Sequence, residues 1–103
     1  MLERVTIETF APLVGDPFTL HVDATRTIDL ELIEATDLGD ASGSAPPAEG
    51  HRTPFSIVFR SASNAILPQR IYQLEHAGLG SFEPFLVPIG PDAVGMRYEA
   101  VFT

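Results

Sequence analysis

The residues of this chain whose types could support chemistry are three histidines, several carboxylates on predicted strands, and an arginine next to a tyrosine. The histidines are His21, His51 and His76. A zinc site needs at least three converging donors, which usually follow one another at short motif spacings. No two of these histidines are separated by one or three residues, so we expect solvated or capping histidines, no metal and no cofactor. The alternative is a metal site assembled in space with help from Asp23 or Glu75.

Two carboxylates share one face of a predicted strand. Asp29 and Glu31 alternate along it, which separates them by about 7 Å. General acid–base catalysis needs two carboxylates that a cleft holds at separated pKa values. The acidic face of this strand continues to Glu34 and has the pattern of a surface open to water. We therefore expect a solvated face and no glycosidase-like pair.

The run Arg97–Tyr98–Glu99 is the most polar part of the last predicted strand. Strand alternation puts Arg97 and Glu99 on one face and Tyr98 on the opposite, inward face. We expect an ion pair between Arg97 and Glu99, beside a cross-strand partner such as Glu75 or Glu83. The alternative is that Arg97 binds a partner.

Motifs of known enzyme classes are missing from the sequence. No serine lies in a Gly-x-Ser-x-Gly turn, and no glycine-rich run leads into a helix that could bind phosphate. Ser42 and Ser44 lie in a stretch that has the composition of a linker. The chain has no cysteine, which excludes disulfides and thiolate chemistry. The sequence therefore predicts a protein that is not an enzyme.

Composition and charge narrow the range of partners. The net charge is −8, and the six basic residues are all arginine. Phosphate binding needs a basic surface, so we expect no nucleic acid, and an acidic chain is repelled by anionic membranes. No apolar run approaches the roughly 18 residues of a membrane span, and the start lacks a signal-peptide pattern. We expect a soluble cytoplasmic protein that does not insert into a membrane. This expectation also covers a protein that is later built into an assembled particle.

Alternating apolar residues predict an all-β fold. The chain of 103 residues has the length of one domain, and its nine prolines and eight glycines indicate many turns. A bulge is expected near Leu32–Ile33. We predict a single domain over residues 1–103, a small six-stranded antiparallel barrel or half-barrel, because closure protects strand edges in a short chain. The predicted strands cover residues 18–22, 28–33, 55–60, 70–76, 82–92 and 95–102.

Two further segments flank the predicted strands. Residues 9–15 do not alternate, and we expect a short helical turn that Thr9 caps and Gly15 ends. This turn would place Phe10, Leu13 and Val14 against an open end of the sheet; the alternative is a loosely ordered arm. Residues 38–53 are rich in glycine, serine and proline, which predicts a mobile surface loop. That loop is either a tolerated insertion or a segment that becomes ordered on a partner.

One apolar surface is left without cover by this scheme. The strand over residues 82–92 is apolar on both faces, and such strands need a covering layer. Further apolar residues on neighbouring strands also point away from the core. We expect a protein partner or self-association at this surface. The predicted partner-binding residues are Val58, Ile71, Phe85, Val87, Arg97 and Val101.

The segments TIETFAPLVG at residues 6–15, FLVPIG at 85–90 and MRYEAVF at 96–102 carry a resemblance to a known group of proteins. The chain resembles a family of short, uncharacterised bacterial and phage all-β domains, over nearly its whole length apart from residues 38–52. The family has no assigned activity, so the resemblance implies no functional residues. Some relatives resemble neighbours of genes for phage-tail or tail-fibre-like proteins, which implies a role in assembly.

Three functions follow from these observations. The first is a non-enzymatic structural or protein-interaction module, for example an accessory of a phage-tail-like assembly. The second is a small-molecule-binding β-barrel with a cavity lined by Phe55, Phe59, Tyr72 and Phe102. Small barrels fill their interiors with their own side chains, so we do not expect a small ligand. The third, an enzyme, has no motif in its support.

Overall fold

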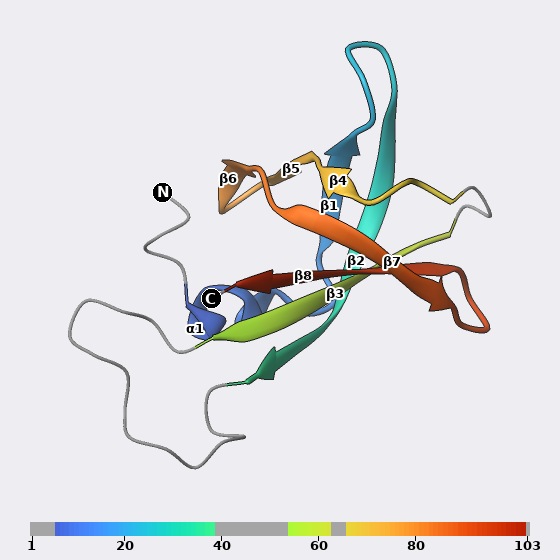
Figure 1. Ribbon diagram of the computed structural model, residues 1–103. Coiled ribbons are helices and arrows are strands. Elements are labelled where there is room, and N and C mark those ends of the chain that lie inside the picture. The colour runs from blue at the N-terminus through green and yellow to red at the C-terminus, as the bar shows by residue number, and fades with distance from the viewer. Residues whose placement is uncertain (1–5, 39–53, 63–65, 103) are drawn as a thin grey trace.

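Residues 6–38, 54–62 and 66–102 are described by the computed structural model, and all structural statements concern them (Figure 1). They form one antiparallel sheet in the order β4-β7-β8-β3-β2-β1-β5-β6. The predicted loop over residues 38–53 lies outside the described residues except for Leu38, whose N–H donates to the Pro54 carbonyl at 2.9 Å. The strands are β1 (Pro17–His21), β2 (Thr27–Asp37), β3 (Phe55–Ser61), β4 (Arg70–Ile71), β5 (Gln73–His76), β6 (Gly80–Phe82), β7 (Phe85–Pro91) and β8 (Met96–Phe102).

Eight strands take the place of the six predicted ones because two long strands bend. The predicted strand 70–76 is divided at Tyr72, and the strand 82–92 is divided at Glu83–Pro84. These two bends face each other, since the Tyr72 N–H donates to the Pro84 carbonyl at 3.1 Å. Pro84 has no N–H with which to donate a hydrogen bond back to the opposite strand. The strand pairing is therefore interrupted at Pro84 and continues on both sides of it.

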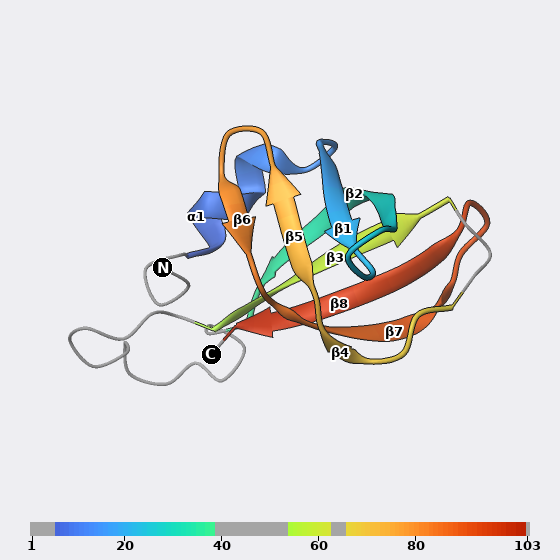
Figure 2. The same cartoon turned by 90° about the horizontal axis from the view of Figure 1, so that it is seen from above.

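The bends curl the sheet. β4 runs into β5, although β4 is the first strand in the sheet order and β5 the last but one. The sheet therefore wraps round into a half-barrel with α1 at one end (Figures 1 and 2). The predicted all-β, antiparallel half-barrel with a short N-terminal helical segment is confirmed. The bulge expected near Leu32–Ile33 is also confirmed, because the register of β2 against β3 shifts between Leu32 and Glu34.

The N-terminal helical segment consists of α1 (Ile7–Phe10) and a 3₁₀ turn over Ala11–Leu13. Its N-cap is Thr6, not Thr9 as predicted. Thr6 has an extended backbone, and its N–H donates to the Thr9 hydroxyl at 3.2 Å, so Thr9 lies inside the first turn. Gly15 follows the segment with φ +98°, a conformation that glycine adopts readily.

Phe10 fixes this segment to the sheet. The side chain is fully buried, whereas Leu13 is only partly buried against the same core. Val14 is 46% exposed, so its predicted burial is wrong; it follows the 3₁₀ turn, where the backbone has already left the helical conformation. The Phe10 ring centroid lies 5.6–5.9 Å from three other rings, those of Phe55, Phe82 and Phe102.

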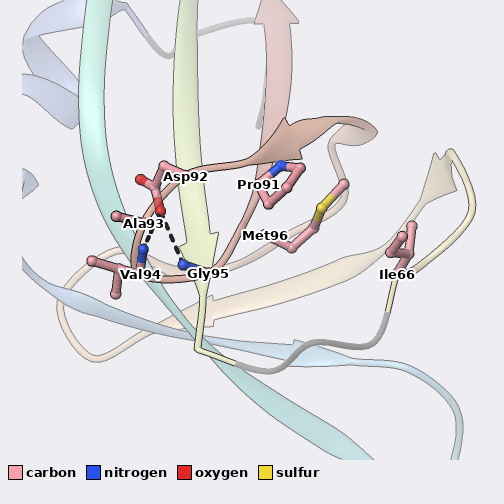
Figure 3. Close-up of a pocket in the computed structure, with 7 residues that line it drawn as sticks. All are labelled: Ile66, Pro91, Asp92, Ala93, Val94, Gly95 and Met96. Atoms are coloured by element: carbon pink, nitrogen blue, oxygen red, sulfur yellow. Dashed lines mark hydrogen bonds between the residues drawn. The ribbon is translucent and has the colours of Figure 1, made fainter.

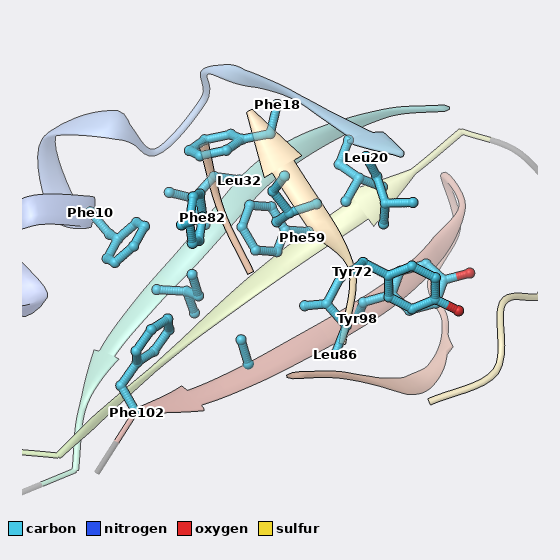
Figure 4. Packing of buried hydrophobic residues seen from close by; sticks show 14 of the residues in the cluster. Phe10, Phe18, Leu20, Leu32, Phe59, Tyr72, Phe82, Leu86, Tyr98 and Phe102 are labelled. Carbon is cyan, nitrogen blue, oxygen red and sulfur yellow. The ribbon is translucent and has the colours of Figure 1, made fainter. Parts of the chain in front are cut away.

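The core fills the concave side of the half-barrel (Figure 4). Strand alternation predicts that Phe55, Ile57 and Phe59 of β3 and Leu74 of β5 face inward, and all four are buried there. At the end opposite Phe10, two tyrosine hydroxyls hold the chain segment that precedes β4. The Tyr98 hydroxyl accepts the Leu67 N–H at 3.0 Å, and the Tyr72 hydroxyl donates to the Pro68 carbonyl at 2.6 Å. The half-barrel is thus covered by chain at both ends.

The turn between β7 and β8 is packed against the end of β3. A Cβ atom on Gly95 would lie 1.8 Å from the Ser61 carbonyl oxygen. The backbone would have to move to relieve this clash. We expect Gly95→Ala to lower the free energy of unfolding by about 2 kcal/mol or more. Urea titration would measure the loss. Gly78→Ala is the matched control, because its Cβ would meet only the His76 ring at 3.5 Å.

A second substitution tests whether Phe10 anchors α1 to the sheet. We expect Phe10→Ala to cost about 4 kcal/mol, because it removes a fully buried ring. Val14→Ala, four residues on and exposed, should change stability by less than about 0.5 kcal/mol. Equal, small losses in the two thermal unfolding curves would contradict the role assigned to α1.

Candidate partner-binding surface

An exposed apolar surface lies on the convex side of β4, β7 and β8. Ile71 of β4 is paired with Phe85 of β7. The pairing of β7 with β8 begins at Val87, opposite Glu99; Phe85 precedes Val87 by two residues and Val101 follows Glu99 by two, so both lie at the same end of this pair of strands. Ile71, Phe85 and Val101 are therefore the row at this end of three neighbouring strands, and Val87 follows Phe85 on the same face of β7. We call these four residues, Ile71, Phe85, Val87 and Val101, the apolar patch.

Strand alternation determines the outward orientation of the patch. Leu86 is fully buried in the core, so its neighbours Phe85 and Val87 point outward. Ile71 is 60%, Phe85 50% and Val101 53% exposed, and Val87 is half-buried. These four members of the predicted partner-binding set lie together at one place on the surface.

Val58, a fifth member of the predicted set, is not exposed. Its side chain points outward from β3 but is only 4% exposed. The register places Val58 between Glu34 of β2 and Glu99 of β8. Cross-strand neighbours have Cβ atoms about 5 Å apart, and the aliphatic stems of long acidic side chains can cover a small apolar residue. The prediction failed because β3 is a central strand with a long side chain on each side.

Arg97, the last member of the set, lies outside the patch. It is half-buried and is paired across β3–β8 with Arg60, two pairs beyond Glu99. Its Nε donates to the Gly90 carbonyl at 3.3 Å. The predicted ion pair between Arg97 and Glu99, beside Glu75 or Glu83, is not among the ion pairs of the described residues. A backbone carbonyl takes its place because β7 bulges next to Arg97 between Pro88 and Gly90.

A network centred on Arg60 was not foreseen from the sequence. Its Nη1 donates to Asp92 at 3.0 Å and its Nη2 to Glu31 at 3.2 Å. The other Asp92 oxygen accepts the N–H groups of Val94 and Gly95 at 2.8 and 2.9 Å (Figure 3). These backbone bonds, followed by Arg60, lower the pKa of Asp92 to about 2. The Asp-x-x-Gly spacing was the available signal for the turn, whereas the contact with Arg60 spans 32 residues.

The two histidines in the described part of the chain, His21 and His76, serve local structure. His76 Nδ1 accepts two backbone N–H groups, so the other nitrogen, Nε2, carries the proton and donates to Asp16 at 2.9 Å. The predicted capping role is thereby confirmed for His76. His21 contacts Glu75 across β1 and β5. The two N–H groups that His76 accepts are those of Gly78 and Leu79, at 3.0 and 3.1 Å.

The acidic and histidine side chains of the described residues are dispersed over the molecule. Within residues 6–38, 54–62 and 66–102, no three His, Cys, Asp or Glu side chains are grouped as metal ligands would be. His51 lies outside these ranges. Asp29 and Glu31 are both exposed, and Glu31 is bound to Arg60. The helices of the described chain are too short and too polar to span a bilayer.

Two features of the structure concern the binding of a small ligand, namely the aromatic rings of the core and a pocket on the surface. The four residues predicted to line a cavity are all buried within the core cluster, where the Phe55 and Phe102 rings stack 4.8 Å apart. A pocket of about 280 Å³ lies elsewhere, at the turn between β7 and β8 (Figure 3). Its volume lies just below the range of about 300–1,000 Å³ that is usual for ligand sites. Its lining consists of Ile66, Pro91, Asp92, Ala93, Val94, Gly95 and Met96.

The low pKa of Asp92 predicts a pH dependence of stability. Because its pKa falls from 3.8 to about 2 on folding, the ionised Asp92 stabilises the fold above pH 3.8, and this contribution is lost as the pH falls toward 2. The stability difference between wild type and Asp92→Asn should therefore be constant at neutral pH and shrink below pH 3.8. Urea titrations across this range would measure it. Asp29→Asn, an exposed carboxylate outside the turn, is the control; a difference independent of pH would contradict the prediction.

The comparisons with known proteins address the family of the chain and leave its function open. No curated protein and no solved structure is significantly similar to it. A family model described as a domain of unknown function, DUF6916, matches residues 5–102. This match confirms the resemblance to an uncharacterised family that the sequence indicated. The chain belongs to the DUF6916 family, whose model spans almost its entire length.

Proposed function

We propose that this protein is a non-enzymatic structural or protein-interaction module, and that the apolar patch is its docking surface. The observation that carries the proposal is the row Ile71, Phe85 and Val101, in which each side chain is at least half exposed. The inner faces of the same strands already fill the core. Contiguous exposed apolar residues of this kind mark interaction sites on soluble proteins.

The free energy available from the patch fits a docking role. Fully burying a large apolar side chain contributes about 1.5–3 kcal/mol, so a partner that covers the exposed half of one gains about 1 kcal/mol. The three exposed residues together would supply about 3 kcal/mol at the centre of an interface. Since all three lie on paired strands, little conformational entropy is lost when a partner binds.

The resemblance to phage and bacterial domains makes the proposal more specific. Relatives that resemble neighbours of tail or tail-fibre-like genes support an accessory role in a phage-tail-like assembly. In such an assembly, the docking partner is another component of the particle. The protein would then reach its place by protein–protein contact alone.

Native mass spectrometry of the tagged protein, purified gently from its own host, tests the proposal. We expect a stoichiometric protein partner or a defined homo-oligomer with the wild-type chain. The double variant Phe85→Ser, Val101→Ser, called the patch variant, should release it, because two of the three exposed apolar side chains are lost. Val94→Ser is the matched control, since Val94 is 62% exposed but lies in the turn after β7.

Two results would contradict the proposal. One is a monomer without protein partner for both the wild type and the patch variant. The other is a complex that the patch variant retains and the Val94→Ser control loses. Circular dichroism would show that the variants are folded, which we expect because both substituted side chains are exposed.

A further inference from the structure

We propose that the partner of the apolar patch is a different protein, whose own apolar contact residues are flanked by lysine or arginine. This inference rests on the proposed function and adds the chemistry of the partner. It follows from the side chains that surround the patch and from the charge of the whole chain.

The patch is too small to be a complete interface. A half-exposed phenylalanine offers about 100 Å², and four such residues offer at most about 400 Å², whereas a stable interface buries about 800 Å² on each partner. The remaining area must come from the polar residues around the patch. The charge of these residues therefore decides which partner fits.

Three acidic residues lie around the patch on its convex face, in addition to the neutral Ser56 that is paired with Val101. Glu83 is exposed and precedes Phe85 by two residues, so it points outward on the same chain segment. On the other side, Glu99 is half-buried and opposite Val87. Beyond it, Glu34 of β2 is exposed next to Val58. The row of the patch is thus bordered by a carboxylate on each side.

The nearest arginines are bound to other groups. Arg60 is paired with Glu31 and Asp92. Arg97 donates to a backbone carbonyl. Arg70 precedes Ile71 in the chain, but its guanidinium lies 5.0 Å above the Tyr72 ring, and Tyr72 belongs to the core. None of these arginines forms an ion pair with the carboxylates beside the patch, Glu83, Glu99 and Glu34, in the described part of the chain.

A second copy of this chain is a poor occupant for the same reason. In a two-fold dimer the same surface is used by both copies, so the acidic border of one patch meets the acidic border of the other. Each copy also carries a net charge of −8. Like charges at an interface lower affinity and slow association, whereas a basic partner is attracted over a distance.

Selection from a random peptide library, displayed on phage, tests the inference with the full-length chain as bait. Three baits are compared: the wild type, the patch variant, and the double variant Glu83→Gln, Glu99→Gln. We expect the wild type to enrich peptides in which apolar residues are flanked by lysine or arginine. These peptides should bind about tenfold more weakly to the glutamine variant, should lose affinity as salt rises, and should not bind the patch variant.

The possible results separate this inference from the proposed function. Patch-dependent peptides without basic residues, or with affinity unchanged on the glutamine variant, would overturn the inference and leave the docking surface in place. A homodimer that persists in high salt, and that the patch variant abolishes, would do the same. No patch-dependent peptide, together with a monomer in native mass spectrometry, would overturn both. If Glu99→Gln unfolds the chain, Glu83→Gln alone gives the comparison, because Glu83 is exposed.

Discussion

The backbone bond between Tyr72 and Pro84 joins the two bends on which the shape of the molecule depends. A sheet of short strands in a chain of this size would expose two long edges, and exposed edges invite aggregation. Here one continuous segment supplies β4 at one end of the sheet order and β5 near the other end. The bends at Tyr72 and Pro84 make this possible. The same geometry turns Ile71, directly before one bend, and Phe85, directly after the other, outward and so produces the apolar patch.

The amino-acid pattern predicts whatever depends on alternation within one strand. It identified the all-β class, the inward residues of β3 and β5, and the bulge in β2, because each follows from the period of two. The division of the strands was not predictable in this way. Pro84 interrupts the ladder only because it faces Tyr72, 12 residues earlier, and a local pattern does not contain that pairing. The cap was misplaced because threonines at positions 6 and 9 both suit a helix start.

The outward-facing residues of the apolar patch were predictable to the same extent. Alternation alone showed that Ile71, Phe85 and Val101 face outward, and the structure adds that they are neighbours. For Val58 the outward orientation was right and the exposure was wrong, since burial depends on the side chains of two adjacent strands. The network around Arg60 unites three segments of the chain. Its members were visible as charged residues in the sequence, but their grouping comes only from the register of β2, β3 and the β7–β8 turn.

The hydrogen bond between Leu38 and Pro54 affects how well the fold would tolerate an inserted segment. The end of β2 and the start of β3 are paired here, Asp37 with Phe55, so the sheet itself holds Leu38 and Pro54 next to each other. The entropy of closing a loop grows only logarithmically with its length, by about 0.6 kcal/mol per doubling. A segment inserted between these two positions would therefore add little to the cost of folding the half-barrel.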